Sequence, residues 1–86
     1  MEYSLNFTKQ AFKELKEVNM PYYKNIKDAI HNLTINPRPY GYKKLKGTTA
    51  YRIKVSDYRI IYEIYDTIIL IEIISIAHRK EVYKKK

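Results

Sequence analysis

Residues 50–65 read AYRIKVSDYRIIYEIY, and this stretch constrains the fold more than any other part of the chain. Large apolar side chains alternate with other residues on both sides of Ser56 and Asp57, two residue types that favour turns. Because side chains alternate between the two faces of a strand, each half predicts a strand with one apolar face. The stretch therefore predicts a tight hairpin that joins strands at about Ala50–Val55 and Tyr58–Tyr65.

A two-residue turn in this hairpin sets which side chains face each other. It places Lys54 opposite Arg59 on one face of the sheet. Arg52, opposite Ile61, lies on the same face. We expect helices to cover the other face, which is apolar and holds Tyr51, Ile53, Val55, Tyr58, Ile60, Tyr62 and Ile64. Like charges on adjacent strands repel each other, so the cations either discourage aggregation or converge on a bound phosphate.

The residues before the hairpin predict one strand and two helices. Alternation over Glu2–Phe7 indicates a short strand. Thr8 can cap a helix that runs to about Val18. A second helix, capped by Asn19, runs to about Leu33, where the sequence Asn-Pro-Arg-Pro ends it. Apolar residues recur at helical spacing in both segments, so we expect the helices to pack as an antiparallel hairpin.

A third strand is predicted at about residues 67–77, after a turn at Asp66 and Thr67. Regular alternation assigns one half of its side chains to the helix-covered face: Ile69, Ile71 and Ile73. It assigns the other half to the cationic face: Ile68, Leu70, Glu72, Ile74, Ile76 and, if alternation persists, His78. The order of one strand, two helices and a three-stranded antiparallel meander predicts a single α+β domain over residues 1–86.

Charge and composition limit the classes of molecule that the protein is expected to bind and the compartment in which it is expected to act. The 86 residues include 17 Lys and Arg against 9 Asp and Glu, and this net charge of +8 favours nucleic acid, the ribosome or an acidic protein. The lack of cysteine suits a reducing cytoplasm. The N-terminal segment has no signal-peptide pattern, and the longest apolar run is shorter than the ~20 residues that span a membrane. We therefore expect a cytoplasmic protein without a membrane partner.

Reactive side chains follow the third strand: His78, Arg79 and Tyr83. With Lys54 and Arg59 they would supply the groups for metal-free RNA cleavage, in which the ribose 2′-OH attacks the adjacent phosphorus. That reaction needs a base for the 2′-OH, cations for the charge that develops on the phosphate, and an acid for the leaving 5′-oxygen. An arginine fork can hold two phosphate oxygens. Positive neighbours favour the neutral amine of a lysine, so a clustered lysine can act as the base.

Other chemistries lack their residues. With no cysteine and with two isolated histidines, His31 and His78, the chain offers no metal-ligand spacing, and its two glycines form no phosphate-binding loop. We therefore expect no metal ion and no cofactor. The basic segment that leads into the hairpin is either a solvated loop or a grip on the RNA backbone. Its candidate RNA-binding residues are Lys43, Lys44 and Lys46, and Arg52 in the first strand of the hairpin is the fourth candidate.

The motifs KKLKG, YRIKVSDYRIIYEI and IISIAHRKEVY, in that order, resemble the RelE/ParE toxin superfamily, and most of all its RelE branch. The resemblance implies a four-stranded, largely antiparallel sheet with the helices on one face. It implies a toxin of a type II toxin–antitoxin system that enters the ribosomal A site and cuts mRNA there by 2′-OH attack, without a metal ion. It also implies an acidic RelB-like antitoxin that covers the basic groove.

Transferred residue by residue, the resemblance implies specific roles. Lys54 is similar to a catalytic lysine of the family, and Arg59 to the arginine that stabilises the transition state. His78 or Arg79 stands where the family has a C-terminal cationic acid. Tyr83 is similar to a tyrosine that stacks on the substrate base or orients it. The base, Lys54 or His78, and the acid, His78 or Arg79, both stay open.

The chain also departs from the family pattern. Arg52 stands where some members have a second lysine, and it keeps the charge but cannot act as a base. A ParE-like toxin that inhibits DNA gyrase without catalysis would have the same fold, as would an inactive RNA-binding module. The combination of Lys54, Arg59 and Tyr83 favours cleavage.

Overall fold

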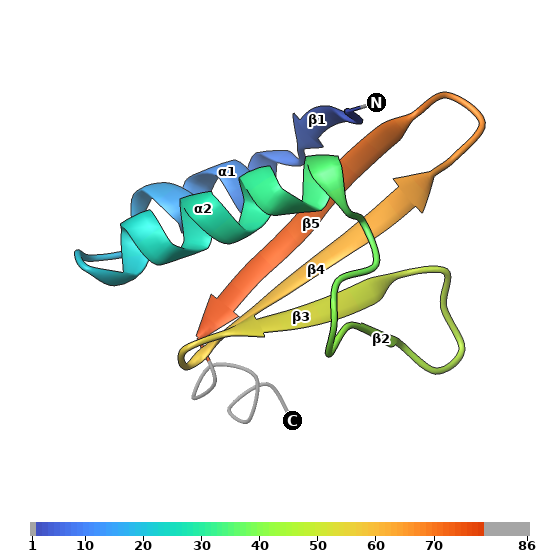
Figure 1. Cartoon of the computed structure of the whole chain (residues 1–86). Helices are drawn as coiled ribbons and strands as arrows, with labels where there is room; N and C mark the ends of the chain where they lie inside the picture. Colours follow the sequence, from blue (N-terminus) through green and yellow to red (C-terminus); the bar gives the residue numbers. More distant parts are fainter. Residues whose placement is uncertain (1, 79–86) are drawn as a thin grey trace.

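The computed structural model describes residues 2–78, which form two layers (Figure 1). Helices α1 (Lys9–Lys16) and α2 (Tyr22–Ile35) lie side by side and cover one face of a mixed five-stranded sheet. The strands are β1 (Ser4–Phe7), β2 (Lys43–Lys44), β3 (Tyr51–Val55), β4 (Tyr58–Tyr65) and β5 (Leu70–His78). The predicted α+β class is confirmed, and so are the N-terminal strand, the two helices and the three-stranded meander β3–β5, but the additional strand β2 lies between α2 and β3.

The sheet has the strand order β1-β5-β4-β3-β2. β1 pairs with β5 in parallel, and the other neighbouring strands pair in antiparallel fashion. The prediction of four strands was wrong, because Lys43 and Lys44 pair with Arg52 and Tyr51 and add a fifth. Two residues are too few to show an alternating pattern, so sequence periodicity could not reveal this strand.

The helix starts follow two different rules. Thr8 caps α1 as predicted, with its hydroxyl accepting from the Ala11 N–H at 3.1 Å. The predicted Asn19 cap of α2 was wrong: the structure has Pro21 at the N-cap, without a side-chain hydrogen bond. A proline suits the start of a helix because its missing N–H would have no partner there. None of the helices within residues 2–78 is long and apolar enough to cross a membrane.

The hydrophobic core lies between the helices and the sheet. Its fully buried large side chains come from α2, β4 and β5: Ile26, Ile30, Leu33, Ile60, Tyr62, Ile71 and Ile73. The pairing of β3 with β4 matches the predicted register, with Val55 opposite Tyr58 and Lys54 opposite Arg59. The apolar face of the hairpin is therefore the helix-covered face, and the cations lie on the open face.

The start of β5 differs from the prediction. The turn between β4 and β5 spans residues 66–69, and Ile69 lies in it with a φ of 54°. The two-residue turn at Asp66 and Thr67 and the placement of Ile69 on the core face were therefore wrong. Ile71 and Ile73 do lie in the core, as predicted.

A β-bulge changes which residues of β5 face the helices. Tyr62 pairs with Ile73 and Ile61 pairs with Ser75, so one extra residue interrupts the alternation. Beyond it, Ile76 pairs with Ile60 and is 2% exposed. His78 pairs with Tyr58, also on the helix-covered face. The predicted placement of Ile76 and His78 on the open face was wrong, because one extra residue moves every later side chain to the other face.

Helix α1 supplies the hydrogen-bond partners of β5 beyond the end of β1. The Glu14 carboxylate accepts from the Ile76 N–H at 2.7 Å and from the Ser75 hydroxyl at 3.3 Å. The Thr8 hydroxyl donates to the Ile74 carbonyl at 2.9 Å. These contacts satisfy the edge of β5 where the bulge lies, because β1 ends opposite Ile73.

Candidate functional site

Four cations form a row on the open face of the sheet. Lys54 lies opposite Arg59, and Arg52 lies opposite Lys43 of β2. Arg52 and Lys54 are two positions apart on β3, about 7 Å along the strand. We call Lys43, Arg52, Lys54 and Arg59 the cation row. The hairpin register and the short strand β2 together place these four side chains on the same side of the sheet.

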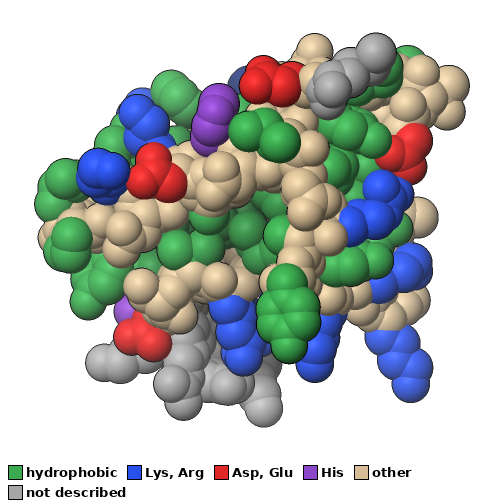
Figure 2. Space-filling view, in the orientation of Figure 1, with side chains coloured by type: hydrophobic (Ala, Val, Ile, Leu, Met, Phe, Trp, Pro, Cys, Tyr) green, Lys and Arg blue, Asp and Glu red, His purple; other side chains and the backbone are tan. Residues whose placement is uncertain are grey.

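No carboxylate within residues 2–78 neutralises the cation row. The salt bridges of this part of the chain are Lys24–Asp28 and Arg38–Asp66, and neither includes a member of the row. Figure 2 shows Lys and Arg side chains projecting along the edge of the molecule that lies away from the helices. Clustered cations without counter-ions create a local positive potential, which attracts polyanions such as RNA.

The opposite end of the open face is acidic. Glu63 pairs across the strands with Glu72, and Glu63 is four positions from Arg59, about 13 Å along β4. The hydroxyls of Thr49 and Tyr65 donate to Glu63 and hold the pKa of its carboxyl below the usual value. The hydrogen bond that Tyr65 donates to Glu63 also raises the pKa of the Tyr65 hydroxyl to about 12. The negative charge of this end repels phosphate, whereas the cation row attracts it.

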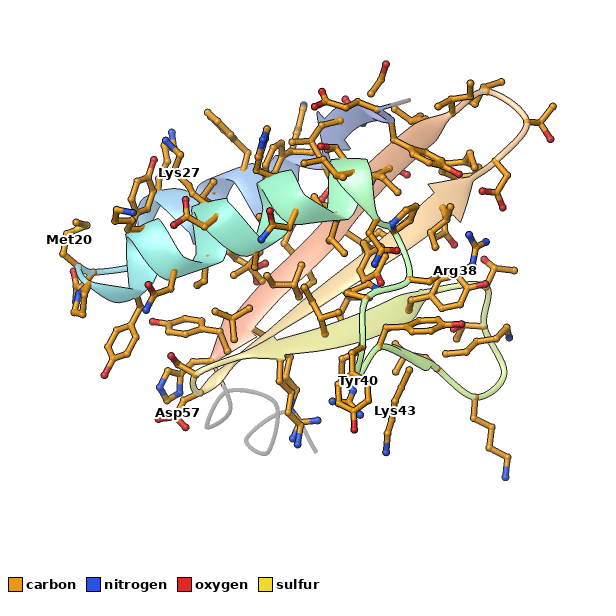
Figure 3. The ribbon with its side chains drawn as sticks, viewed as in Figure 1. Met20, Lys27, Arg38, Tyr40, Lys43 and Asp57 are labelled. Carbon is orange, nitrogen blue, oxygen red and sulfur yellow. The ribbon has the colours of Figure 1, made fainter. Side chains whose placement is uncertain are left out.

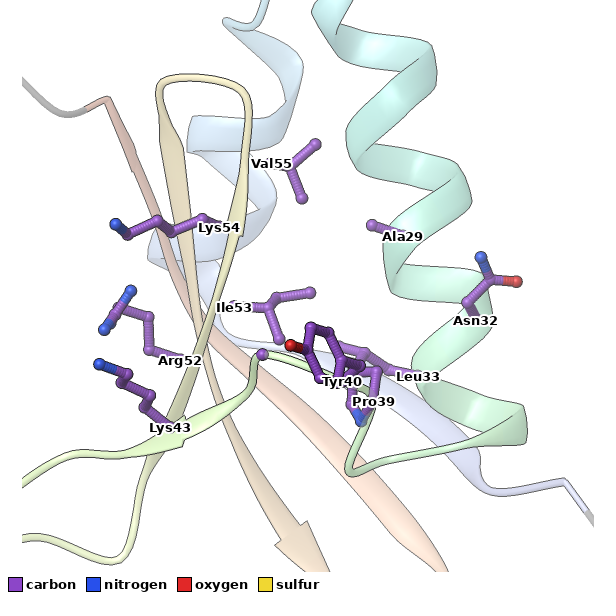
Figure 4. Close-up of a pocket in the computed structure, with 11 residues that line it drawn as sticks. Ala29, Asn32, Leu33, Pro39, Tyr40, Lys43, Arg52, Ile53, Lys54 and Val55 are labelled. Carbon is purple, nitrogen blue, oxygen red and sulfur yellow. The ribbon is translucent and has the colours of Figure 1, made fainter.

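A hollow of about 460 Å³ opens between α2 and β3, beside the cation row. Its wall on the helix side includes Ala29, Asn32 and Leu33. Figure 4 shows Lys43, Arg52 and Lys54 on one side of β3, with Ile53 and Val55 directed to the α2 side. The hollow thus joins an apolar wall to a cationic rim, a combination that suits a ligand with flat bases and charged phosphates.

The structure separates two other predicted RNA-binding residues from the row. Lys44 pairs with Tyr51, and its Nζ donates to the Thr48 carbonyl at 2.5 Å. Lys46 is exposed in the turn that joins β2 to β3, where the Thr48 N–H donates to the Leu45 carbonyl. These lysines were predicted to act together because they are close in the chain. Adjacent residues of a strand point to opposite faces, however, so Lys43 and Lys44 lie on different sides of the sheet.

His78 lies on the helix-covered face, and the sheet separates it from the cation row. Its ring meets the Tyr58 ring edge-on, with 5.0 Å between the centroids. With Tyr58, Glu14 and Glu17 it lines a small cavity of about 70 Å³. Arg79 and Tyr83, the other predicted catalytic residues of the C-terminal segment, lie outside the described residues.

Sequence reasoning missed Tyr40, which lines the hollow together with three members of the row. Figure 3 shows Tyr40 and Lys43 both pointing away from the helices. The signal was present in the sequence as Pro-Tyr-Gly, because proline and glycine around one residue indicate a turn whose middle side chain projects.

The sequence matches the family described as the ParE toxin of the type II toxin–antitoxin system parDE, over residues 5–83. The chain belongs to the RelE/ParE toxin superfamily. It is 32% identical to RelE1 of Methanocaldococcus jannaschii, over 98% of each chain. It is thus a RelE-like toxin of a type II toxin–antitoxin system.

Solved structures show the same fold. The archaeal RelE–RelB complex from Pyrococcus horikoshii OT3 contains a chain 28% identical to this RelE-like toxin, with a TM-score of 0.80 over 92% of this chain and 97% of that one. The RelB–RelE complex from Methanococcus jannaschii gives 31% identity and a TM-score of 0.75 over 92% and 95%. Both relatives were crystallised together with an antitoxin.

Proposed function

We propose that this RelE-like toxin is a ribosome-dependent endoribonuclease that cuts mRNA in the ribosomal A site and so stops translation. The observation that carries the proposal is the pairing of Lys54 with Arg59 on the open face. Both side chains belong to a row that has no neutralising carboxylate within residues 2–78. Similarity to RelE1 and to RelE structures supports the same assignment.

The proposed reaction uses the nucleophile that RNA itself carries. The 2′-oxygen attacks the adjacent phosphorus, and the bond between phosphorus and the 5′-oxygen breaks. The products are a 2′,3′-cyclic phosphate and a 5′-hydroxyl. Arg59 binds two non-bridging oxygens through its fork and stabilises the charge that develops there. Arg52 and Lys43 hold the flanking backbone.

The position of His78 bears on the choice of base. Because His78 faces the helices with Tyr58, we assign the removal of the 2′-OH proton to Lys54, which is exposed on the open face. The acid that protonates the 5′-oxygen is proposed to be Arg79. Tyr83 is proposed to orient the nucleobase of the RNA substrate. Both stay predictions, since they lie outside the described residues.

An acidic, RelB-like antitoxin is the proposed protein partner. The relatives from Pyrococcus horikoshii and Methanococcus jannaschii were each crystallised with RelB. The net charge of +8, with a cation row that no carboxylate within residues 2–78 neutralises, attracts an acidic chain through the same field that attracts RNA. An antitoxin that covers the row would block RNA binding. Free toxin is proposed to act on cytoplasmic ribosomes.

Primer extension on a translated message in a purified translation system tests the proposed function. We expect the wild-type toxin to cut within the A-site codon and to leave a 2′,3′-cyclic phosphate. Arg59→Ala should slow cutting by about 10²–10³-fold, the usual effect of losing a group that stabilises transition-state charge. Its fold should persist, because the side chain points away from the core.

Lys24→Ala is the control for this experiment. It removes the same unit of charge from an exposed position on α2, where Lys24 pairs with Asp28. We expect this variant to cut like the wild type. Wild-type protein that is folded yet leaves the translated message intact would contradict the proposed function, and an unfolded Arg59→Ala variant would contradict the placement of Arg59.

Inhibition of DNA gyrase is the second candidate function, because the matching family is described as a ParE toxin. The shared fold does not separate the two functions. Induced expression in cells does: a nuclease halts protein synthesis at once and leaves cut mRNA, whereas a gyrase inhibitor triggers DNA damage first.

A further inference from the structure

Tyr40 occupies the corner of a tight turn. The Tyr42 N–H donates to the Pro39 carbonyl at 3.0 Å, and Gly41 has a φ of 89°. This hydrogen bond and this φ define a type II turn, with Tyr40 at its second position and glycine where a positive φ is needed. The geometry directs the Tyr40 side chain outward, and its relative exposure is 107%.

The loop that carries this turn is held at both ends. On one side, the buried Tyr62 hydroxyl donates to the Pro37 carbonyl at 2.8 Å. Arg38 pairs with Asp66 at 2.9 Å. On the other side, the Tyr42 ring packs against Tyr51, with 5.7 Å between the ring centroids. Tyr40 is therefore an exposed aromatic ring on an anchored turn, and the anchoring lowers the conformational entropy that this loop loses when a ligand binds.

The surroundings of Tyr40 are cationic. It lines the same hollow as Lys43, Arg52 and Lys54. In Figure 2, a projecting hydrophobic side chain stands between Lys and Arg side chains, at the place where Figure 3 labels Tyr40 beside Lys43. Within residues 2–78, the Tyr40 side chain makes no hydrogen bond and no ring contact. Both faces of the ring are therefore accessible to a ligand.

We propose that Tyr40 is a stacking platform for an unpaired RNA base, next to the phosphates that the cation row binds. The proposal rests on the proposed function and extends the RNA site beyond the scissile phosphate to a neighbouring nucleotide. Aromatic rings interleaved with cations suit single-stranded RNA, because bases stack on the ring while phosphates contact the cations. Stacking accepts every base, so Tyr40 contributes affinity without strict sequence preference.

The chain allows a direct test because it contains no tryptophan. Tyr40→Trp places a single tryptophan at the proposed platform, and its emission can be excited selectively over that of the tyrosines. A short single-stranded RNA should quench its emission, since a stacked base contacts the indole. Inorganic polyphosphate, which has the charge but no bases, should bind the cation row without comparable quenching. Phe12→Trp is the matched control, because Phe12 is 53% exposed on α1, away from the cation row.

The outcomes of the titration are distinct. Quenching by RNA at Tyr40→Trp, but not at Phe12→Trp and not by polyphosphate, supports the proposal. Equal quenching by RNA and polyphosphate would overturn it, since charge alone would then explain the signal. An unchanged emission up to millimolar RNA would overturn it as well, and so would a response to an acidic antitoxin combined with none to RNA.

Cleavage of a translated message provides an independent test of the role of Tyr40. Tyr40→Ala should raise the toxin concentration needed for half-maximal cutting of a translated message by about tenfold, while Tyr40→Phe keeps the ring and should match the wild type. If the wild type cuts and Tyr40→Ala cuts equally well, the stacking proposal fails and the proposed function stands. If RNA quenches Tyr40→Trp but the wild type never cuts, the proposed function fails and the stacking site stands.

Discussion

At the scale of single residues, Tyr62 connects the core to the candidate site. Its side chain is fully buried, and burial raises its pKa to about 12. Its hydroxyl donates to the carbonyl of Pro37, in the loop that leads to Tyr40. This one hydrogen bond therefore stabilises the fold and fixes the loop that forms one wall of the hollow.

Tyr62→Phe should lower the free energy of unfolding by about 1–2 kcal/mol. The variant keeps the aromatic ring, but the carbonyl of the buried residue Pro37 loses its hydrogen-bond donor. Urea denaturation measures this loss. Tyr22→Phe is the control: Tyr22 is 42% exposed and keeps its ring contact with Tyr58. We expect the control to change stability by less than about 0.5 kcal/mol.

The same residue predicts a loss of stability at alkaline pH. In the unfolded chain Tyr62 ionises near its ordinary pKa of 10.0, whereas in the fold it stays neutral up to about pH 12. Between these values ionisation favours the unfolded state, so the stability should fall as the pH rises. Tyr65, whose pKa is also about 12, contributes equally to this fall in the wild type and in Tyr62→Phe. Tyr62→Phe should therefore show a shallower fall than the wild type, and identical slopes would contradict the assignment.

At the scale of secondary-structure elements, the edge of β5 depends on α1. Glu14 accepts from the backbone of Ile76, and Thr8 donates to the carbonyl of Ile74. Helix α1 thus completes the hydrogen bonding of β5 where β1 ends, next to the bulge that turns Ile76 and His78 toward the helices. A strand edge without these partners would leave polar groups unsatisfied.

Glu14→Ala should destabilise the fold by about 1–2 kcal/mol, because it removes the acceptor for two donors on β5. Glu14→Gln keeps a carbonyl oxygen and should recover most of the loss. Glu17→Ala, an exposed carboxylate on the same helix end, is the control. Thermal unfolding followed by circular dichroism gives the comparison, and equal stability of Glu14→Ala and Glu17→Ala would refute the role of Glu14.

At the scale of the whole molecule, charge is divided along the open face. The cation row lies at one end, and Glu63 and Glu72 lie at the other. A polyanion therefore gains attraction at the row and meets repulsion beyond it. This distribution favours a short RNA segment crossing β3 and β4 near Lys54 and Arg59 over one that follows the strands along their full length.

Lys43→Ala and Lys46→Ala should separate the row from the rest of the basic surface. Loss of Lys43, a member of the row, should weaken RNA binding and reduce the slope of log affinity against log salt by about one. Lys46 lies in the turn after β2, so its loss should change the slope less. Anisotropy titrations of a labelled single-stranded RNA at several salt concentrations measure both slopes. A larger effect of Lys46→Ala would contradict the proposed path of the RNA.

Local patterns in the sequence determined the hairpin and much of the cation row. The two-residue turn after Val55 is enough to place Lys54 opposite Arg59, because pairing in a tight hairpin depends on residues that are close in the chain. The cap of α1 by Thr8 is local for the same reason. These features, together with the resemblance to RelE/ParE toxins, could be predicted without a structure.

Tertiary structure alone decided the remaining features. The bulge of β5, and with it the orientation of His78, coincides with hydrogen bonds from Thr8 and Glu14, which are more than 60 residues away in the chain. The short strand β2 forms because its backbone pairs with Tyr51 and Arg52 at the edge of β3. Regular alternation describes a strand in isolation, whereas contacts from distant elements decide where that alternation breaks and which side chains reach the site.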